Sequence, residues 1–219
     1  MKQRTVDFAR AKDGALLPKL AQALGHTLSA DANERLLRYV ELVVTWNKKL
    51  DLTAARGAHG QLEVLLADAL VLASPAIIPS GARVVDVGSG AGAPALALLL
   101  ARPDLHVTLV EPLQKRVAFL RTVIGTLGVV AQSTVVHAKL DPEAVQLEGA
   151  PFDIAMSRAT FAPEVWVPTG LVLAARSFAL LAAQSEPPAP AGSTLQATHD
   201  YALPFSQAPR RLAIYGRES

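Results

Sequence analysis

The 219-residue chain contains no cysteine, and this absence excludes several kinds of chemistry. Disulfide scaffolds, cysteine-ligated zinc, iron–sulfur clusters and covalent catalysis by a thiol all require cysteine. Charged residues are also scarce, at 18% of the chain, where an average soluble domain has roughly 25%. Because hydrophobic residues make up 51%, the composition indicates a folded globular protein and excludes general disorder.

An excess of charge of one sign is missing as well. Lys and Arg number 21 against 19 Asp and Glu, so the net charge is only +2. Proteins that bind nucleic acid through charge alone carry a much denser positive surface. If this chain has a nucleic-acid partner, the cations that contact it must be gathered around one local site.

Long hydrophobic runs are absent too. Apolar stretches such as 93–101 are shorter than the roughly 18 to 20 residues that span a bilayer. The first residues, 1–7, are polar and are not followed by the apolar segment of a secretory signal. We therefore expect a cytoplasmic protein that has no membrane partner.

The first part of the chain has the residue spacing of helices. From Glu34 to Val44, apolar side chains recur every three or four positions, and Asp31 is placed as a helix N-cap. A second helix is predicted over 61–73, because prolines and a glycine follow it. These features predict a helical N-terminal region over residues 1–79.

From residue 80 onward, short apolar runs alternate with helical segments. This alternation predicts an α/β fold over 80–219, with a parallel, doubly wound sheet and helices on both faces. An antiparallel hairpin is expected after the Pro-rich segment 186–192. The expected strands are 83–87, 106–110, 133–137, 152–156 and 178–183, the expected helices are 94–102 and 114–127, and the hairpin strands are 197–203 and 211–215.

A glycine-rich segment, D-V-G-S-G-A-G-A-P over 86–94, lies between the first predicted strand and the helix after it. Gly88, Gly90 and Gly92 allow the backbone to turn tightly and to approach a ligand. Glu111 ends the next strand about 20 residues later, where a carboxylate can accept hydrogen bonds from ribose hydroxyls. This arrangement predicts a cofactor that contains ribose.

Two cofactors fit such a loop. Residues 88–93 match the dinucleotide pattern G-x-G-x-x-G/A, so NAD is one alternative, and a purely structural glycine turn is another. Asp86 favours S-adenosylmethionine, because a carboxylate there would attract the ammonium group of that cofactor and repel a diphosphate. S-adenosylmethionine is therefore the predicted cofactor.

Several motifs together resemble the RsmG (GidB) family of bacterial methyltransferases, which methylate N7 of a guanine in 16S ribosomal RNA. The resemblance implies a Rossmann-like class I methyltransferase domain, with 16S rRNA or the 30S subunit as the partner. We expect the chain to act as a monomer. The motifs are W-N-K and L-T-A within 46–54, the glycine loop at 86–94, V-T-L-V-E at 107–111, K-R and F-L within 115–120, F-D at 152–153 and S-R-A at 157–159.

The resemblance also implies site residues. The glycine loop would line the cofactor, Glu111 would hold its ribose, and the pair Leu140 and Asp141 would flank its adenine. Arg158 would lie at both the cofactor and the target base. The predicted cofactor-binding residues are Asp86, Gly88, Gly90, Gly92, Ala93, Glu111, Leu140, Asp141 and Arg158, and no metal site is predicted.

Methylation at N7 suits the residues that are present. N7 carries an available lone pair, so the reaction needs no general base and no covalent nucleophile, and its rate depends on alignment. Arg158 and Lys139 are predicted to position the nucleotide, and Asp51 is predicted to offset the positive charge that develops on the methylated purine.

Some positions depart from the pattern of the family. Leu65 and Ala69 stand where the family has His and Ser, Asp51 replaces Asn, and 183–184 replace a Lys-Gly pair. Two alternatives therefore remain open at this point. One is a divergent methyltransferase that acts on another RNA or a small molecule, and the other is a non-catalytic module that binds the cofactor or the ribosome.

Overall fold

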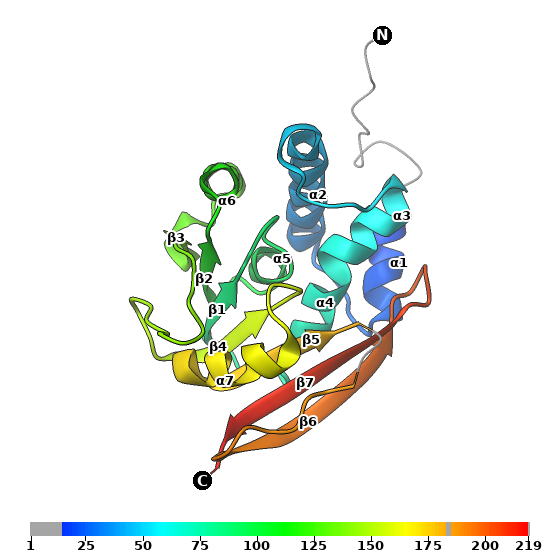
Figure 1. Cartoon of the computed structure of the whole chain (residues 1–219). Coiled ribbons are helices and arrows are strands. Elements are labelled where there is room, and N and C mark those ends of the chain that lie inside the picture. Colours follow the sequence, from blue (N-terminus) through cyan, green and yellow to red (C-terminus); the bar gives the residue numbers. More distant parts are fainter. Residues whose placement is uncertain (1–14, 183–184, 219) are drawn as a thin grey trace.

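A mixed sheet forms the centre of the computed structural model, which describes residues 15–182 and 185–218 (Figure 1). The strand order is β3-β2-β1-β4-β5-β7-β6, with β1 to β5 parallel and β7 antiparallel to both of its neighbours. The strands are β1 (Arg83–Val87), β2 (His106–Glu111), β3 (Ser133–His137), β4 (Phe152–Ser157), β5 (Ala174–Leu181), β6 (Ser193–Ala202) and β7 (Pro209–Arg217).

The predicted parallel sheet and the terminal hairpin are confirmed. β5 begins at Ala174, four positions before the expected start, because it follows the preceding helix directly. The expected end of that strand at residue 183 lies outside the described residues. The strand order reverses between β1 and β4, and in doubly wound sheets such a reversal opens a ligand crevice at the carboxyl ends of the strands.

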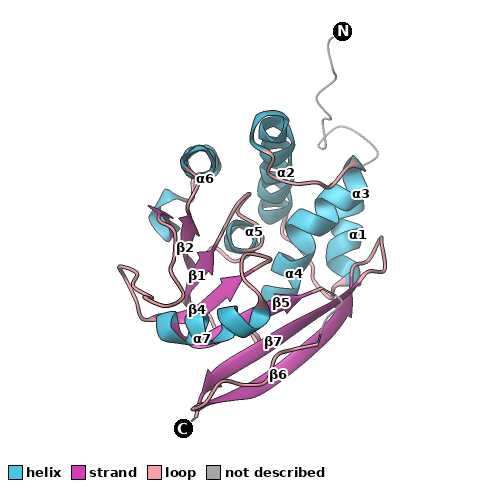
Figure 2. Ribbon diagram, viewed as in Figure 1, coloured by secondary structure: helices cyan, strands magenta, loops and turns pink. Residues whose placement is uncertain are grey.

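Helices surround the sheet unevenly (Figure 2). A buried core on one face joins Leu36 of α2 and Leu96 of α5 with Val84 of β1, while Val85 points to the other face, where Trp166 of α7 covers it. The N-terminal helices thus share a core with the sheet. The helices are α1 (Leu16–Ala23), α2 (Ala30–Leu50), α3 (Gly57–Leu62), a π-helical turn (Glu63–Ala67), α4 (Asp68–Leu72), α5 (Ala95–Ala101), α6 (Gln114–Leu127) and α7 (Pro163–Leu173).

Three helix predictions need correction. The N-cap of α2 is Ser29, whose Oγ accepts a hydrogen bond from the Ala32 N–H at 3.1 Å. Asp31 lies inside the first turn and pairs with Arg35. The second predicted helix begins at Gly57, earlier than residue 61. The sequence pattern missed α7 because this helix contains Pro168 and is apolar on most sides, so it shows no helical periodicity.

Within the part of the chain that the structure describes, every helix is too short or too polar to cross a membrane. The division of the chain at residue 79 stays a prediction.

Candidate active site

Hydrogen bonds from two neighbouring elements hold the glycine loop after β1. The N–H groups of Gly88 and Ser89 donate to the carbonyl of Val110 in β2, at 2.8 and 3.1 Å. From α2, the buried hydroxyl of Tyr39 donates to the carbonyl of Ala91 at 3.0 Å. The loop is therefore fixed by both β2 and a helix of the N-terminal region.

The glycines of this loop differ in their surroundings. Gly88 has φ +78°, and a Cβ placed there would collide with the side chain of Thr160. Gly90 has φ +54°, and the nearest atom to a Cβ there would be the carbonyl oxygen of Gly88, at 3.9 Å. Gly88 is thus needed for packing, while Gly90 borders open space that a ligand can occupy.

Alanine at these two glycines should therefore have different effects. Gly88→Ala should destabilise the fold by about 2 to 5 kcal/mol, through backbone strain and the collision with Thr160. Gly90→Ala should lower stability by only about 1 to 2 kcal/mol but should weaken cofactor binding at least tenfold. Urea denaturation and calorimetric titration would measure the two quantities, and equally tight binding by Gly90→Ala would contradict this view of the loop.

Glu111, the predicted ribose-binding residue, faces the glycine loop. Its side chain is buried, with Oε2 accepting from the Gly90 N–H at 2.8 Å and Oε1 accepting from the Leu113 N–H at 2.9 Å. Each carboxylate oxygen can accept more than one hydrogen bond. Glu111 therefore has a fixed orientation and spare acceptor capacity beside the open space over Gly90.

Asp86 is a buried acid with an unpaired oxygen. The residue is 1% exposed, and Oδ2 has no hydrogen-bond partner within the described residues. Burial raises the pKa of this carboxyl group to about 7, although the positive charge of Arg158 acts in the opposite direction. An unpaired buried oxygen is costly unless a donor reaches it, so Asp86 suits a cationic group of a ligand. The unpaired acceptor of Asp86 thus fits the ammonium group of S-adenosylmethionine.

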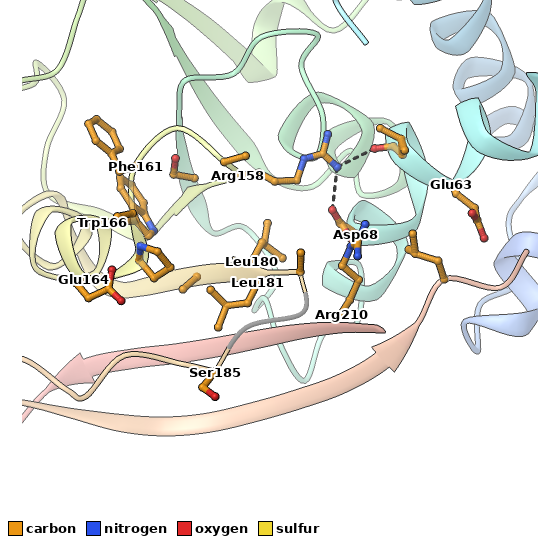
Figure 3. A pocket seen from close by; sticks show the side chains of 18 residues that line it. Glu63, Asp68, Arg158, Phe161, Glu164, Trp166, Leu180, Leu181, Ser185 and Arg210 are labelled. Atoms are coloured by element: carbon orange, nitrogen blue, oxygen red, sulfur yellow. Dashed lines mark hydrogen bonds and ion pairs between the residues drawn. The ribbon is translucent and has the colours of Figure 1, made fainter. Parts of the chain in front are cut away.

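Arg158 follows β4 and is anchored by a helix (Figure 3). Its Nη1 donates to Asp68 Oδ2 at 2.8 Å and to the Val64 carbonyl at 2.7 Å. Nε and Nη2 make no hydrogen bond to another described residue, which leaves three N–H donors for a ligand. The next residue, Ala159, has φ +57°, an unusual conformation for a non-glycine residue and one that is enriched at functional sites.

A cavity of about 730 Å³ opens beside Arg158, at the carboxyl ends of β4 and β5 (Figure 3). Its walls combine aromatic and aliphatic side chains with a few charged ones, so they suit a planar base that carries polar edges. β4 lies between β1 and β5 in the sheet, so Arg158 follows the strand between the glycine loop and the end of β5, and no residue of the loop is part of the cavity lining. Residues of the lining include Glu63, Asp68, Arg158, Phe161, Glu164, Trp166, Leu180, Leu181 and Arg210.

The other predicted residues lie on elements other than the end of β4 that carries Arg158. Lys139 is exposed after β3, and β3 and β4 are three places apart in the sheet, roughly 14 Å at the usual strand spacing. Leu140 is buried under the second face, and exposed Asp141 accepts from the Glu143 N–H at 3.0 Å. Asp51 is exposed at the end of α2, where its carbonyl accepts from Arg116 Nη2 at 3.1 Å.

The sequence interpretation gave no role to Asp68. Asp68 is 4% exposed and pairs with Arg158, while its Oδ1 accepts from the Tyr201 hydroxyl at 2.7 Å. An acid inside the apolar run L-L-A-D-A-L-V-L was the available signal, since buried acids need a partner. Tyr39 and Thr160, which contact the glycine loop or the end of β1, have no comparable signal in the sequence.

Known sequences identify the family of this chain. The sequence model of the rRNA small subunit methyltransferase G family, GidB, matches residues 32–177. The Ribosomal RNA small subunit methyltransferase G of Anaeromyxobacter dehalogenans is 36% identical over 207 residues, or 90% of this chain and 94% of that protein. The chain belongs to this family. The protein of the same name from Myxococcus xanthus is 33% identical over 226 residues, or 97% of this chain and 100% of that protein.

Solved structures share the fold of this family member at low sequence identity. A candidate RNA methyltransferase from Pyrococcus horikoshii has a TM-score of 0.53 and 17% identity, covering 94% of this chain and 100% of that chain. A candidate methyltransferase from Escherichia coli has a TM-score of 0.51 and 20% identity, covering 66% of this chain and 82% of that chain.

The predicted family, the Rossmann-like fold and the predicted enzyme class, an rRNA methyltransferase, are thereby confirmed. The family and the fold also imply that S-adenosylmethionine is the methyl donor.

Proposed function

We propose that this chain transfers a methyl group from S-adenosylmethionine to N7 of a guanine in 16S rRNA. Membership of the family supports the reaction class. The observation that carries the proposal is the buried Asp86 oxygen beside the glycine loop, which has no partner among the described residues. A carboxylate at this place favours a cationic amino-acid group over the diphosphate of NAD.

The residues around the loop would hold the cofactor, which supplies an electrophilic methyl group when bound. Glu111 would accept hydrogen bonds from its ribose hydroxyls, and Asp86 would attract its ammonium group, directly or through water. The backbone from Gly88 to Ala93 would line it, and Leu140 with Asp141 would flank its adenine. These roles agree with the burial of Glu111 and Asp86 and with the open space over Gly90.

The guanine would enter from the cavity on the far side of Arg158. The three free N–H donors of Arg158 would position the nucleotide through a phosphate or a base edge, with N7 turned toward the methyl group. Because the N7 lone pair attacks directly, no residue needs to remove a proton, and alignment supplies most of the rate. Asp51 would offset the developing positive charge on the purine from outside the cavity.

Two of the positions that depart from the family pattern do not weigh against 16S rRNA as the substrate. Leu65 and Ala69 are both 1% exposed and belong to the main core. Their apolar side chains therefore contribute to packing of the helix and are not part of the lining of the cavity beside Arg158. Residues 183–184 lie outside the described residues.

Incubation with labelled cofactor and undermodified 16S rRNA, free or within 30S subunits, tests the proposal. We expect one methyl group at N7 of a single guanine. Label on a different RNA would indicate the divergent enzyme, and cofactor binding without label on any RNA would indicate the non-catalytic module. Calorimetric titration should show binding of S-adenosylmethionine and none of NAD.

Lys139 should contribute to RNA binding more than to chemistry. It is an exposed cation on the side of the site away from Arg158, where a phosphate contact would be screened by salt. Lys139→Ala should raise the KM for rRNA about three- to tenfold with little change in kcat, and the salt dependence of KM should become weaker. Steady-state kinetics at several salt concentrations would measure this, and an unchanged KM would remove Lys139 from the site.

A further inference from the structure

Asp68 connects Arg158 to a strand that is distant in the sequence. Asp68 begins α4 and is 4% exposed. One carboxylate oxygen accepts from Arg158 Nη1 at 2.8 Å, and the other accepts from the hydroxyl of Tyr201, near the end of β6, at 2.7 Å. Both oxygens of the carboxylate are therefore engaged, each by a different element of the fold.

These contacts restrict the orientation of the guanidinium group. Asp68 cannot rotate about its terminal bond without losing the hydrogen bond from Tyr201. Arg158 Nη1 is also held by the Val64 carbonyl at 2.7 Å, so its position is defined by two acceptors on the same helical segment. Burial and the negative charge of Asp68 raise the pKa of the Tyr201 phenol, which keeps the hydroxyl protonated as a donor.

We propose that Tyr201 is a positioning residue for methyl transfer. Its hydroxyl fixes the Asp68 carboxylate, and Asp68 in turn directs the free N–H groups of Arg158 toward the ligand. This inference rests on the proposed role of Arg158. Tyr201 lies beyond residues 32–177, the part of the chain that the family model matches, and its partner across the hairpin, Arg210, lines the cavity.

Tyr201→Phe removes only the hydroxyl, and Tyr215→Phe is its matched control. The Tyr215 hydroxyl donates to the Pro187 carbonyl at 2.6 Å in the same hairpin, without contact to Asp68. Tyr201→Phe should lower kcat about five- to twentyfold with the KM for cofactor within about twofold of the original, since it loosens a charge-assisted hydrogen bond. Tyr215→Phe should leave kcat unchanged, whatever its effect on melting temperature.

Repeating Tyr201→Phe in a chain without the Arg158 guanidinium group distinguishes a positioning role of Tyr201 from a general loss of stability. In an Arg158→Lys chain, which lacks the guanidinium group, Tyr201→Phe should change the residual kcat less than about twofold. An equal loss of kcat in both backgrounds, or no loss in the original chain, would overturn the proposal.

A measurement without turnover keeps the test independent of the substrate. The resonance of the Arg158 Nη1–H group that donates to Asp68 is assigned by its disappearance in Arg158→Lys. In Tyr201→Phe it should move toward the shift of exposed arginines and exchange faster with water, whereas in Tyr215→Phe it should stay unchanged. If the original chain methylates no 16S rRNA, the proposed function fails. The resonance still decides whether Tyr201 orients Arg158. An unchanged resonance in Tyr201→Phe would refute that role.

Discussion

Replacing Arg158 by alanine should reduce methyl transfer to 16S rRNA by at least a thousandfold. The substitution removes the three N–H donors that the proposed function assigns to positioning the nucleotide and, with them, the alignment on which N7 methylation would depend. The affinity for S-adenosylmethionine should fall much less, because the glycine loop, Asp86 and Glu111 remain. Methylation assays and calorimetric titration on the same preparations would separate the two effects.

The loss of stability in Arg158→Ala must be measured alongside its activity. The buried carboxylate of Asp68 would keep Tyr201 but lose its guanidinium partner, at a cost of up to about 3 to 5 kcal/mol. Adding Asp68→Asn should restore much of that stability without restoring activity. Arg102→Ala is a matched control, because Arg102 also pairs with an acid, Asp104, and donates to a backbone carbonyl, that of Ala73. Arg102→Ala should keep its turnover, and normal rRNA methylation by Arg158→Ala would remove Arg158 from the mechanism.

Replacing Asp86 by asparagine should make the ligand-free protein more stable and the cofactor complex weaker. Burial raises the pKa of Asp86 to about 7 from 3.8, so the folded chain binds this proton more tightly than the unfolded chain does. The contribution of this tighter proton binding to the free energy of unfolding is fully present below about pH 4. It is lost as the pH rises through 7. At pH 8 the ionised group costs up to about 4 kcal/mol, and Asp86→Asn should recover part of it.

Cofactor binding should depend on pH in the opposite direction. Between pH 6 and 8, ionisation of Asp86 should strengthen binding of the cofactor ammonium in the original chain, with a midpoint near the pKa of about 7. Asp86→Asn should bind at least tenfold more weakly at pH 8 and should show no such midpoint. Titrations at several pH values, paired with thermal melts, provide both measurements. Tight binding by Asp86→Asn at pH 8 would show that the carboxylate does not hold the cofactor.

The elements of this structure that could be predicted from the sequence are those that local residue patterns determine. β1, the glycine loop and Glu111 follow from alternating strands and glycines, because the carboxyl ends of parallel strands meet at one edge. α7 could not be predicted in this way, since an apolar helix that contains Pro168 shows no helical periodicity. Asp68 and Arg158 are 90 positions apart, and Asp68 and Tyr201 are 133 apart. Such pairs are formed only by the tertiary fold.

The position of β7 in the sheet affects how the protein can be made. β7 lies between β5 and β6, although it follows both of them along the chain. While the chain is being synthesised, β5 is complete well before the strand that covers its outer edge, and an uncovered strand edge is a template for aggregation. A nascent or truncated chain that stops before Pro209 would expose this edge, so we expect such chains to require chaperones or to be degraded.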